Sequence, residues 1–169
     1  MVSLELLDVY DSQGNVTGRK IVRGDKSEIL GSDEHIAIAV IFIENNNGEF
    51  LIQKTSKEKG GEFSSTGGHV DSGETPLMSI KREALEELGV NIENDNIYEY
   101  GFLSFDMPLR YLFYIKKDIP IDTIIVQDEE VEYVKYMSVS EINELIDTGQ
   151  MLKSHSVMFN ELMKKLNMR

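Results

Sequence analysis

Three carboxylates, those of Glu83, Glu86 and Glu87, are spaced so that they could act together on one ligand. In a helix these positions stand at i, i+3 and i+4, so the side chains share one face with Cβ atoms about 5 to 6 Å apart. Like charges at this spacing cost roughly 0.2 to 0.5 kcal/mol per pair. A divalent cation would convert that cost into binding, because Mg²⁺ prefers hard oxygen ligands. The alternative is a solvated acidic face on which Arg82 pairs with Glu86 one turn away.

The neighbouring residues predict the helix that this acidic face requires. Thr75 followed by Pro76 is typical of a helix start, since a hydroxyl can cap free backbone donors and proline is tolerated in the first turn. Gly89 is typical of a helix end. An apolar face recurs at helical spacing, and we expect it to pack on a sheet; it consists of Leu77, Ile80, Ala84 and Leu88.

The segment just before this helix also contains residues that could support the site. Gly68 and Gly73 are expected to bracket a tight turn. Glu74 lies where it could hold Arg82, which would orient the carboxylate of Glu83 toward a metal.

Residues 68–90 resemble the Nudix box. The pattern of that family is Gly, five residues, Glu, seven residues, Arg-Glu, an apolar residue, any residue, Glu-Glu, any residue, Gly and an apolar residue. The matching positions are Gly68, Glu74, Arg82, Glu83, Ala84, Glu86, Glu87, Gly89 and Val90. The resemblance implies an α+β fold, an α/β/α sandwich with a mixed sheet, and one Nudix domain over residues 1–169.

The same resemblance implies a pyrophosphohydrolase that uses Mg²⁺, with Mn²⁺ as an alternative metal. Hydroxide from a metal-bound water would attack phosphorus in line with the leaving phosphate. The expected metal site comprises Gly68, Glu83, Glu86, Glu87 and Glu130, and the expected catalytic residues are Glu74, Arg82, Glu86 and Glu87. Glu87 would either complete the metal shell or act as the base. Because some subfamilies place the base outside the helix, the acidic run Asp128, Glu129, Glu130 and Glu132 is an alternative.

Three residues outside the helix are candidates for contact with substrate. Lys54 and Arg110 could reach phosphate groups from a loop and a facing strand, although solvation at the surface is an equally good interpretation for the lysine. His69 directly follows the first glycine of the box. A structural role is the alternative for this histidine.

The N-terminal segment resembles a branch of the same superfamily. Residues 4–20, with Arg23 and His35, are similar to the arm of isopentenyl-diphosphate isomerase and its hydrolase-like relatives. His35 and His69 resemble two of the isomerase's metal-site histidines, and Asp128 and Glu130 fall roughly where its metal carboxylates lie. Gly67 occupies the position of the isomerase's cysteine, and the chain contains no cysteine. Hydrolysis is therefore favoured over isomerisation, and a Nudix-fold ligand sensor without turnover is a third alternative.

Composition limits the class of protein and its partners. A chain of 169 residues with 41% apolar residues can bury one core, and without cysteine it has neither disulfides nor a thiol nucleophile. A net charge of −13 disfavours nucleic acid polymers and anionic membranes as partners, and favours a small diphosphate bound through a metal. The acidic N-terminus does not resemble a signal peptide, and no apolar run approaches the ~18 residues of a membrane span, so we expect a cytoplasmic protein.

Periodicity predicts the remaining elements. Residues 4–10 and 17–22 are expected to form a hairpin within an N-terminal arm of residues 1–30, and a homodimer is an option because this arm could pack across subunits. A central strand over 35–43 should turn at Asn47-Gly48 and pair back through 49–54. Further strands are predicted at 98–105, 109–115 and 131–137, and further helices at 138–148 and 154–166.

Overall fold

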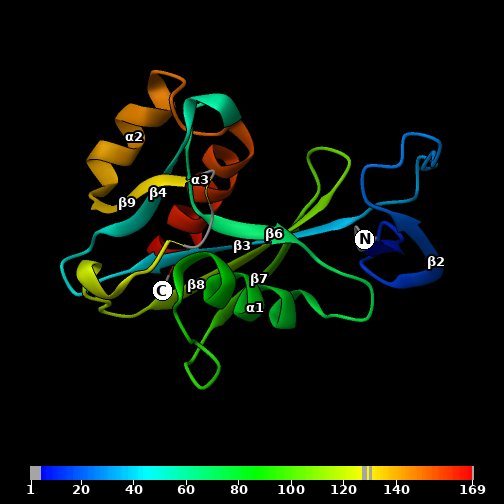
Figure 1. Ribbon diagram of the computed structural model, residues 1–169, viewed down its shortest axis with the longest axis horizontal. Coiled ribbons are helices and arrows are strands. Elements are labelled where there is room, and N and C mark those ends of the chain that lie inside the picture. The colour runs from blue at the N-terminus through cyan, green and yellow to red at the C-terminus, as the bar shows by residue number, and fades with distance from the viewer. Residues whose placement is uncertain (1–4, 127–128, 130, 169) are drawn as a thin grey trace.

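The chain folds into a mixed β-sheet with helices on both faces, as a computed structural model shows (Figure 1). The structure describes residues 5–126, 129 and 131–168. The strands are β1 (Leu6–Tyr10), β2 (Val16–Val22), β3 (Ala37–Glu44), β4 (Phe50–Thr55), β5 (Phe63–Ser64), β6 (Thr66–His69), β7 (Tyr98–Leu103), β8 (Leu109–Lys116) and β9 (Val131–Met137). The helices are α1 (Pro76–Leu88), α2 (Val139–Asp147) and α3 (Lys153–Asn167), with 3₁₀ turns at Lys57–Lys59 and Ile121–Thr123.

The central strand β3 separates two apolar cores. Ala39 and Ile41 pack on the face covered by α1, whereas Val40 and Phe42 pack on the face covered by α2 and α3. Successive side chains of a strand point to opposite faces, so one apolar run serves both cores. Figure 1 shows α1 on one side of the sheet and α2 and α3 on the other. The predicted α/β/α sandwich is confirmed.

The sheet opens between β3 and β4. These strands share one residue pair, Glu44 with Phe50, at the turn. Beyond it β3 pairs with β6 and β4 pairs with β9, so the prediction that residues 49–54 pair back along 35–43 is wrong past the turn. The ring of Phe159 from α3 packs against Phe42 and Phe50, with centroids 5.6 and 5.4 Å away. Core side chains thus hold these strands where backbone bonds do not.

Strand β6 was not predicted, because Gly67 and Gly68 have the composition of a loop. Both glycines permit close packing. A Cβ on Gly67 would lie 2.3 Å from the carbonyl oxygen of Ala39, and one on Gly68 would lie 2.4 Å from Glu83 Oε1. Gly68 therefore belongs to a strand and not to the expected tight turn, which Gly73 makes with a φ of +89°.

The predicted ends of the site helix are confirmed. The Thr75 hydroxyl accepts a hydrogen bond from the Met78 amide at 3.1 Å, Pro76 begins α1, and Gly89 ends it in the left-handed conformation with φ 67°. The capping box of Ser138 and Glu141 starts α2 in the same region as predicted. Among the described residues, no helix has the length and apolar character needed to span a membrane.

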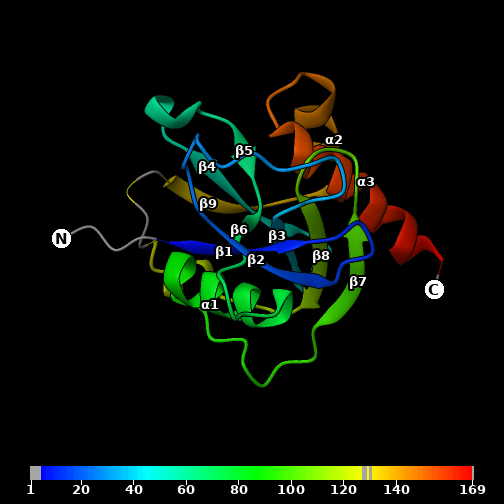
Figure 2. The same cartoon turned by 90° about the vertical axis from the view of Figure 1, so that its right-hand side faces the viewer.

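The β1–β2 hairpin is fastened to the loop that precedes α1. The buried carboxylate of Asp8 accepts hydrogen bonds from Lys20 Nζ at 2.9 Å, Ser72 Oγ at 2.8 Å and the Gly73 amide at 3.0 Å. The Ser72 amide also donates to the Leu6 carbonyl at 2.8 Å. Figure 2 looks onto the hairpin, which lies beside α1 at one end of the molecule. The arm therefore packs on its own chain, and the homodimer stays a prediction.

Candidate active site

The acidic face of α1 borders a cavity of about 290 Å³. We call it the acidic cavity. Its lining consists of Glu5, Arg23, His69, Asp71, Arg82, Glu83, Glu86 and Glu87. The three carboxylates that the helical spacing groups on one face therefore meet at one hollow of the surface, beside the hairpin and the end of β6.

Each nitrogen of the Arg82 guanidinium contacts at least one carboxylate. Its Nε and Nη2 donate to Glu74 Oε2 and Oε1 at 2.7 and 2.9 Å, a bidentate pair. Its Nη1 donates to Glu83 Oε1 at 3.0 Å and to Glu86 Oε2 at 3.2 Å, and Nη2 lies 3.3 Å from Asp71 Oδ2. The hydrogen bonds from Arg82 lower the pKa of Glu74. Glu74 therefore fixes the guanidinium, and the guanidinium fixes Glu83.

Glu83 is more enclosed than Glu86, with side chains 14% and 60% exposed. Burial raises the pKa of Glu83, the charge of Glu86 adds to that rise, and Arg82 opposes it. A hydrogen bond also joins the carboxyl groups of Glu83 and Glu87. Gly68 passes beneath this group without a side chain, which leaves the space that Glu83 fills.

His69 closes the cavity at the end of β6. Burial and the nearby charge of Arg23 lower the pKa of His69 to about 4, so the imidazole is neutral at pH 7. Its carbonyl oxygen accepts from Ser79 Oγ at 3.3 Å and from Arg82 Nη2 at 3.4 Å. These contacts tie the end of the strand to α1.

The donor set fits a hard divalent cation. Glu83, Glu86 and Glu87 supply carboxylate oxygens, and such ligands suit Mg²⁺. In the part of the chain that the structure describes, no three acidic or imidazole groups already converge on a single point. Instead, Arg82 Nη1 bridges Glu83 and Glu86, so a cation bound by these groups would compete with the guanidinium for their oxygens.

Comparison with known proteins identifies the family of the chain. The family profile of the NUDIX domain matches residues 33–157. The chain belongs to the NUDIX family. Residues 68–90, which we interpret as its Nudix box, begin within β6, end just after α1 and carry Arg82 and the three carboxylates.

Individual relatives place it among the Nudix hydrolases, a family of enzymes. An uncharacterised Nudix hydrolase of Listeria monocytogenes is 28% identical over 154 residues, 88% of this chain and 89% of that protein. The 8-oxo-dGTP diphosphatase of Haemophilus influenzae is 33% identical over 87 residues, 47% of this chain and 61% of that protein. A crystal structure of a Deinococcus radiodurans protein has the same fold, with a TM-score of 0.72 and 21% identity over 87% of this chain and 91% of that one.

Two of the predicted substrate contacts of this Nudix hydrolase are bonded to other groups of the chain. Lys54 donates to the Gly61 carbonyl and stands over the ring of Phe63, with Nζ 5.0 Å from the centroid. Arg110 makes a bidentate pair with Asp106, with its closest distance at 2.8 Å. Neither residue lines the acidic cavity. His69 is the predicted contact that does.

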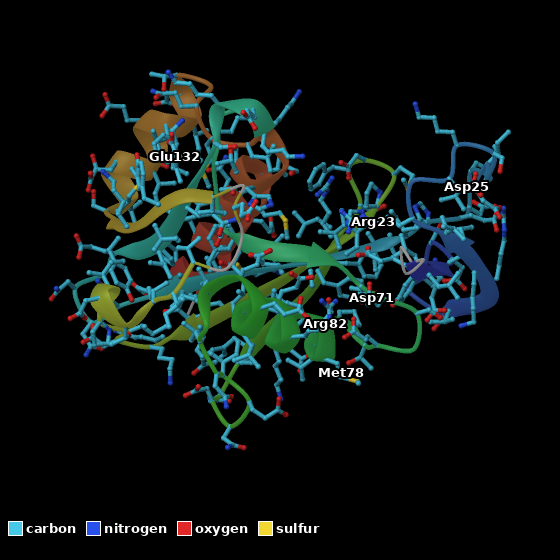
Figure 3. All side chains as sticks on the ribbon, in the orientation of Figure 1. Arg23, Asp25, Asp71, Met78, Arg82 and Glu132 are labelled. Atoms are coloured by element: carbon cyan, nitrogen blue, oxygen red, sulfur yellow. The ribbon has the colours of Figure 1, made fainter. Side chains whose placement is uncertain are left out.

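The acidic run before β9 is only partly described. Asp128 and Glu130 lie outside the described residues, so the prediction of Glu130 as a metal ligand stays a prediction. Glu129 and Glu132 are exposed. Figure 3 shows Glu132 far from Arg82 and Asp71.

His35 has a structural environment in this Nudix protein. Its Nδ1 is hydrogen-bonded to the Met107 carbonyl at 2.7 Å and its Nε2 to Ser12 Oγ at 3.0 Å. Backbone bonds of 2.7 and 2.9 Å join His35 to Tyr10 of the hairpin. This residue helps to dock the arm, and it does not line the acidic cavity.

Three residues of the cavity were missed by reasoning from the sequence. Asp71 lies within the variable part of the Nudix box, and as a carboxylate between Gly68 and Glu74 it could have been noticed. Glu5 and Arg23 come from the hairpin, which precedes the matched family segment. Nothing in their spacing relates them to α1, because only the docking of the arm brings them there.

Proposed function

We propose that this Nudix hydrolase cleaves a diphosphate linkage in a nucleoside diphosphate-linked or similar small metabolite, with Mg²⁺ as the cofactor and Mn²⁺ as an alternative. The observation that carries the proposal is the Arg82 cluster. One guanidinium, fixed by Glu74, lies between two carboxylates at a cavity whose remaining acids face the same space. The name of the Haemophilus influenzae relative, a diphosphatase, supports the same bond type.

Four residues would hold the metal: Glu83, Glu86, Glu87 and Gly68. Bound there, the cation would supply a water of lowered pKa and neutralise phosphate charge. The second contribution matters for this chain, since a net charge of −13 repels a free diphosphate.

Arg82 and Glu74 act as positioning residues in this proposal. Every nitrogen of the Arg82 guanidinium already contacts a carboxylate, so the group orients Glu83 and is not a phosphate ligand. Glu74 keeps the guanidinium in that orientation through two charge-assisted hydrogen bonds, a geometry that fixes both distance and plane.

Glu86 and Glu87 are the candidates for accepting the proton of the attacking water. The Glu86 side chain is 60% exposed, so water reaches it from the mouth of the cavity. Glu87 lies one residue on and shares a hydrogen bond with Glu83. A base must lie within hydrogen-bond reach of the water, and both carboxylates line the same cavity.

The isomerase alternative conflicts with the backbone around β6. The position of its cysteine is Gly67, where a Cβ would lie 2.3 Å from the Ala39 carbonyl oxygen and 3.0 Å from Val40 Cα. A cysteine there would require the two strands to separate. Protonation of an alkene carbon by a thiol therefore has no support in this chain.

The test is a panel of diphosphate compounds incubated with Mg²⁺ or Mn²⁺, with each product identified. Wild type is compared with Glu86→Gln and Glu87→Gln. The matched control is Glu144→Gln, which makes the same change at an exposed position of α2. We expect metal-dependent cleavage that both site variants lose and the control keeps. Ligand binding without turnover across the panel would refute the hydrolase and support a sensor.

A further inference from the structure

A second cavity, of about 370 Å³, lies where the hairpin meets the sheet. We call it the hairpin pocket. Its floor and walls are mainly aliphatic, and its lining consists of Leu7, Ile21, Val22, Arg23, Gly24, Asp25, Glu28, Leu30, Ile36, His69 and Met107. None of these side chains carries a phenyl, phenol or indole ring. The pocket therefore suits an aliphatic group better than a base that binds by stacking on an aromatic ring.

The hairpin pocket and the acidic cavity share two residues, Arg23 and His69. A ligand that passes between these side chains would place one end among the carboxylates and the other among the aliphatic groups. Of these two side chains, the guanidinium of Arg23 carries a permanent positive charge.

Arg23 differs from Arg82 in what it already binds. Its Nη1 donates to Glu5 Oε2 at 2.9 Å, and its side chain is 49% exposed. Among residues 5–126, 129 and 131–168, the Arg23 guanidinium makes this one hydrogen bond. The Arg82 guanidinium, in contrast, contacts four carboxylates. Guanidinium groups recognise phosphate through paired donors. Arg23 is thus the guanidinium at the cavity with donors to offer a phosphate.

The position of Arg23 is set by the docking of the arm. The carboxylate of Asp8 accepts hydrogen bonds from Ser72 and Gly73, and the Ser72 amide donates to the Leu6 carbonyl, so the hairpin is bonded directly to the loop that carries Asp71. Figure 3 shows Arg23 and Asp71 where the hairpin approaches the body of the protein, with Arg82 nearby on α1.

We propose that the substrate is the diphosphate of an aliphatic alcohol, with its organic group in the hairpin pocket, its inner phosphate on Arg23 and its terminal phosphate over the carboxylates of α1. This inference rests on the proposed function and narrows its substrate class. Water would form a bond to the terminal phosphorus and the bridging oxygen would leave, releasing orthophosphate and the alkyl monophosphate. One proton of the water would pass to a carboxylate. Arg23 would stabilise the charge on the leaving phosphate.

Binding is tested apart from turnover with three methylene-bridged diphosphonates, in which carbon replaces the cleavable oxygen. One has no organic group, one carries an isopentenyl group and one carries adenosine. Their dissociation constants are measured by calorimetry with Mg²⁺. We expect the isopentenyl compound to bind at least about 10-fold tighter than the other two, since burial of several CH₂ groups contributes more than 1.4 kcal/mol.

Two variants locate the subsites. Arg23→Gln should raise the dissociation constants of all three compounds by about 10- to 100-fold, which is the contribution of a hydrogen bond to an ionised group. Met107→Trp should fill the hairpin pocket and raise the dissociation constant of the isopentenyl compound by about 10-fold. The dissociation constant of the compound without an organic group should not change. Met107 is 48% exposed, so the larger ring is tolerated, and Met168→Trp at an 80% exposed position is the matched control.

The outcomes separate the two proposals. The proposed substrate class is overturned if the adenosine compound binds more tightly than the isopentenyl compound, or if Arg23→Gln and Met107→Trp leave the dissociation constants unchanged. Either result counts even if diphosphates are hydrolysed. The expected binding pattern without hydrolysis of the oxygen-bridged compounds upholds the substrate class and overturns the hydrolase.

Discussion

The two adjacent glycines of β6 should respond in opposite ways to the same substitution. A Cβ at Gly67 would meet the Ala39 carbonyl oxygen at 2.3 Å, and this oxygen belongs to the backbone of the central strand. A Cβ at Gly68 would meet Glu83 Oε1 at 2.4 Å, and this atom ends a side chain that can rotate. Gly67→Ala should therefore damage the fold, whereas Gly68→Ala should damage the site.

The magnitudes follow from these contacts. Neither glycine has a positive φ, so alanine is compatible with both backbones. At Gly68 the gain of about 0.4 to 1 kcal/mol from a less flexible unfolded chain is offset by about 0.5 to 1.5 kcal/mol for an off-rotamer Glu83. The free energy of unfolding of Gly68→Ala should therefore differ from that of the wild type by less than about 1 kcal/mol. Gly67→Ala must separate two strands, and overpacking of this kind costs about 1 to 3 kcal/mol or more.

The catalytic rate of Gly68→Ala, unlike its stability, should fall strongly. Glu83 Oε1 must withdraw from 2.4 Å to at least the 3.4 Å of ordinary contact, a shift of about 1 Å. A displacement of this size at a reacting centre costs about 100-fold in rate, and Mg²⁺ demands near-ideal ligand geometry. Gly68→Ala should thus lose about 100-fold in kcat and bind Mn²⁺ more weakly.

Guanidinium chloride unfolding followed by circular dichroism reports stability, and electron paramagnetic resonance of free Mn²⁺ reports metal affinity. Gly31→Ala is the control. Gly31 has no positive φ, and a Cβ there would meet Glu34 Oε1 at 3.4 Å, so the added methyl group also faces a glutamate side chain but without a severe overlap. Wild-type kcat and Mn²⁺ affinity in folded Gly68→Ala would refute the role assigned to Gly68. A stable Gly67→Ala would refute the close approach of β6 to β3.

Three further changes test the supports of the site. Glu74→Gln should lower kcat by about 10- to 100-fold with little change in KM, because it loosens Arg82 without touching substrate, and an unchanged kcat would contradict the positioning role. Asp8→Asn should cost about 1 to 3 kcal/mol and speed hydrogen exchange at the Ser72 amide, whereas unchanged exchange would show that the Asp8 carboxylate does not fasten the arm. His155, whose Nδ1 accepts from the Ser65 amide at 2.9 Å, has its pKa lowered by burial to about 4, so the unfolded state binds more protons between pH 4 and 6.5. Stability should therefore fall by up to about 3 kcal/mol as pH drops through that window, and urea unfolding of His155→Asn should lack this contribution; equal slopes in the two proteins would contradict it.

The helix of the site could be predicted from the sequence, because its determinants are local. Thr75, Pro76 and Gly89 set its ends, and the i, i+3, i+4 spacing places Glu83, Glu86 and Glu87 together in any helix. The link from Glu74 to Arg82 was also predicted, since it follows from the family pattern of the box. These features need no knowledge of the rest of the fold.

Only the tertiary structure decided what faces that helix. Gly67 and Gly68 looked like loop residues, yet both pair with β3; the backbone of β3 leaves no room for a Cβ at Gly67, and Glu83 occupies the space beside Gly68. Arg110 is as cationic as Arg23 and nearer to the box in sequence, yet it pairs with Asp106 and does not line the cavity. Arg23 reaches the cavity because Asp8, buried in the hairpin, binds the loop before α1, more than 60 residues away in the chain. Contacts between distant segments depend on how whole elements pack, and residue spacing carries no record of that packing.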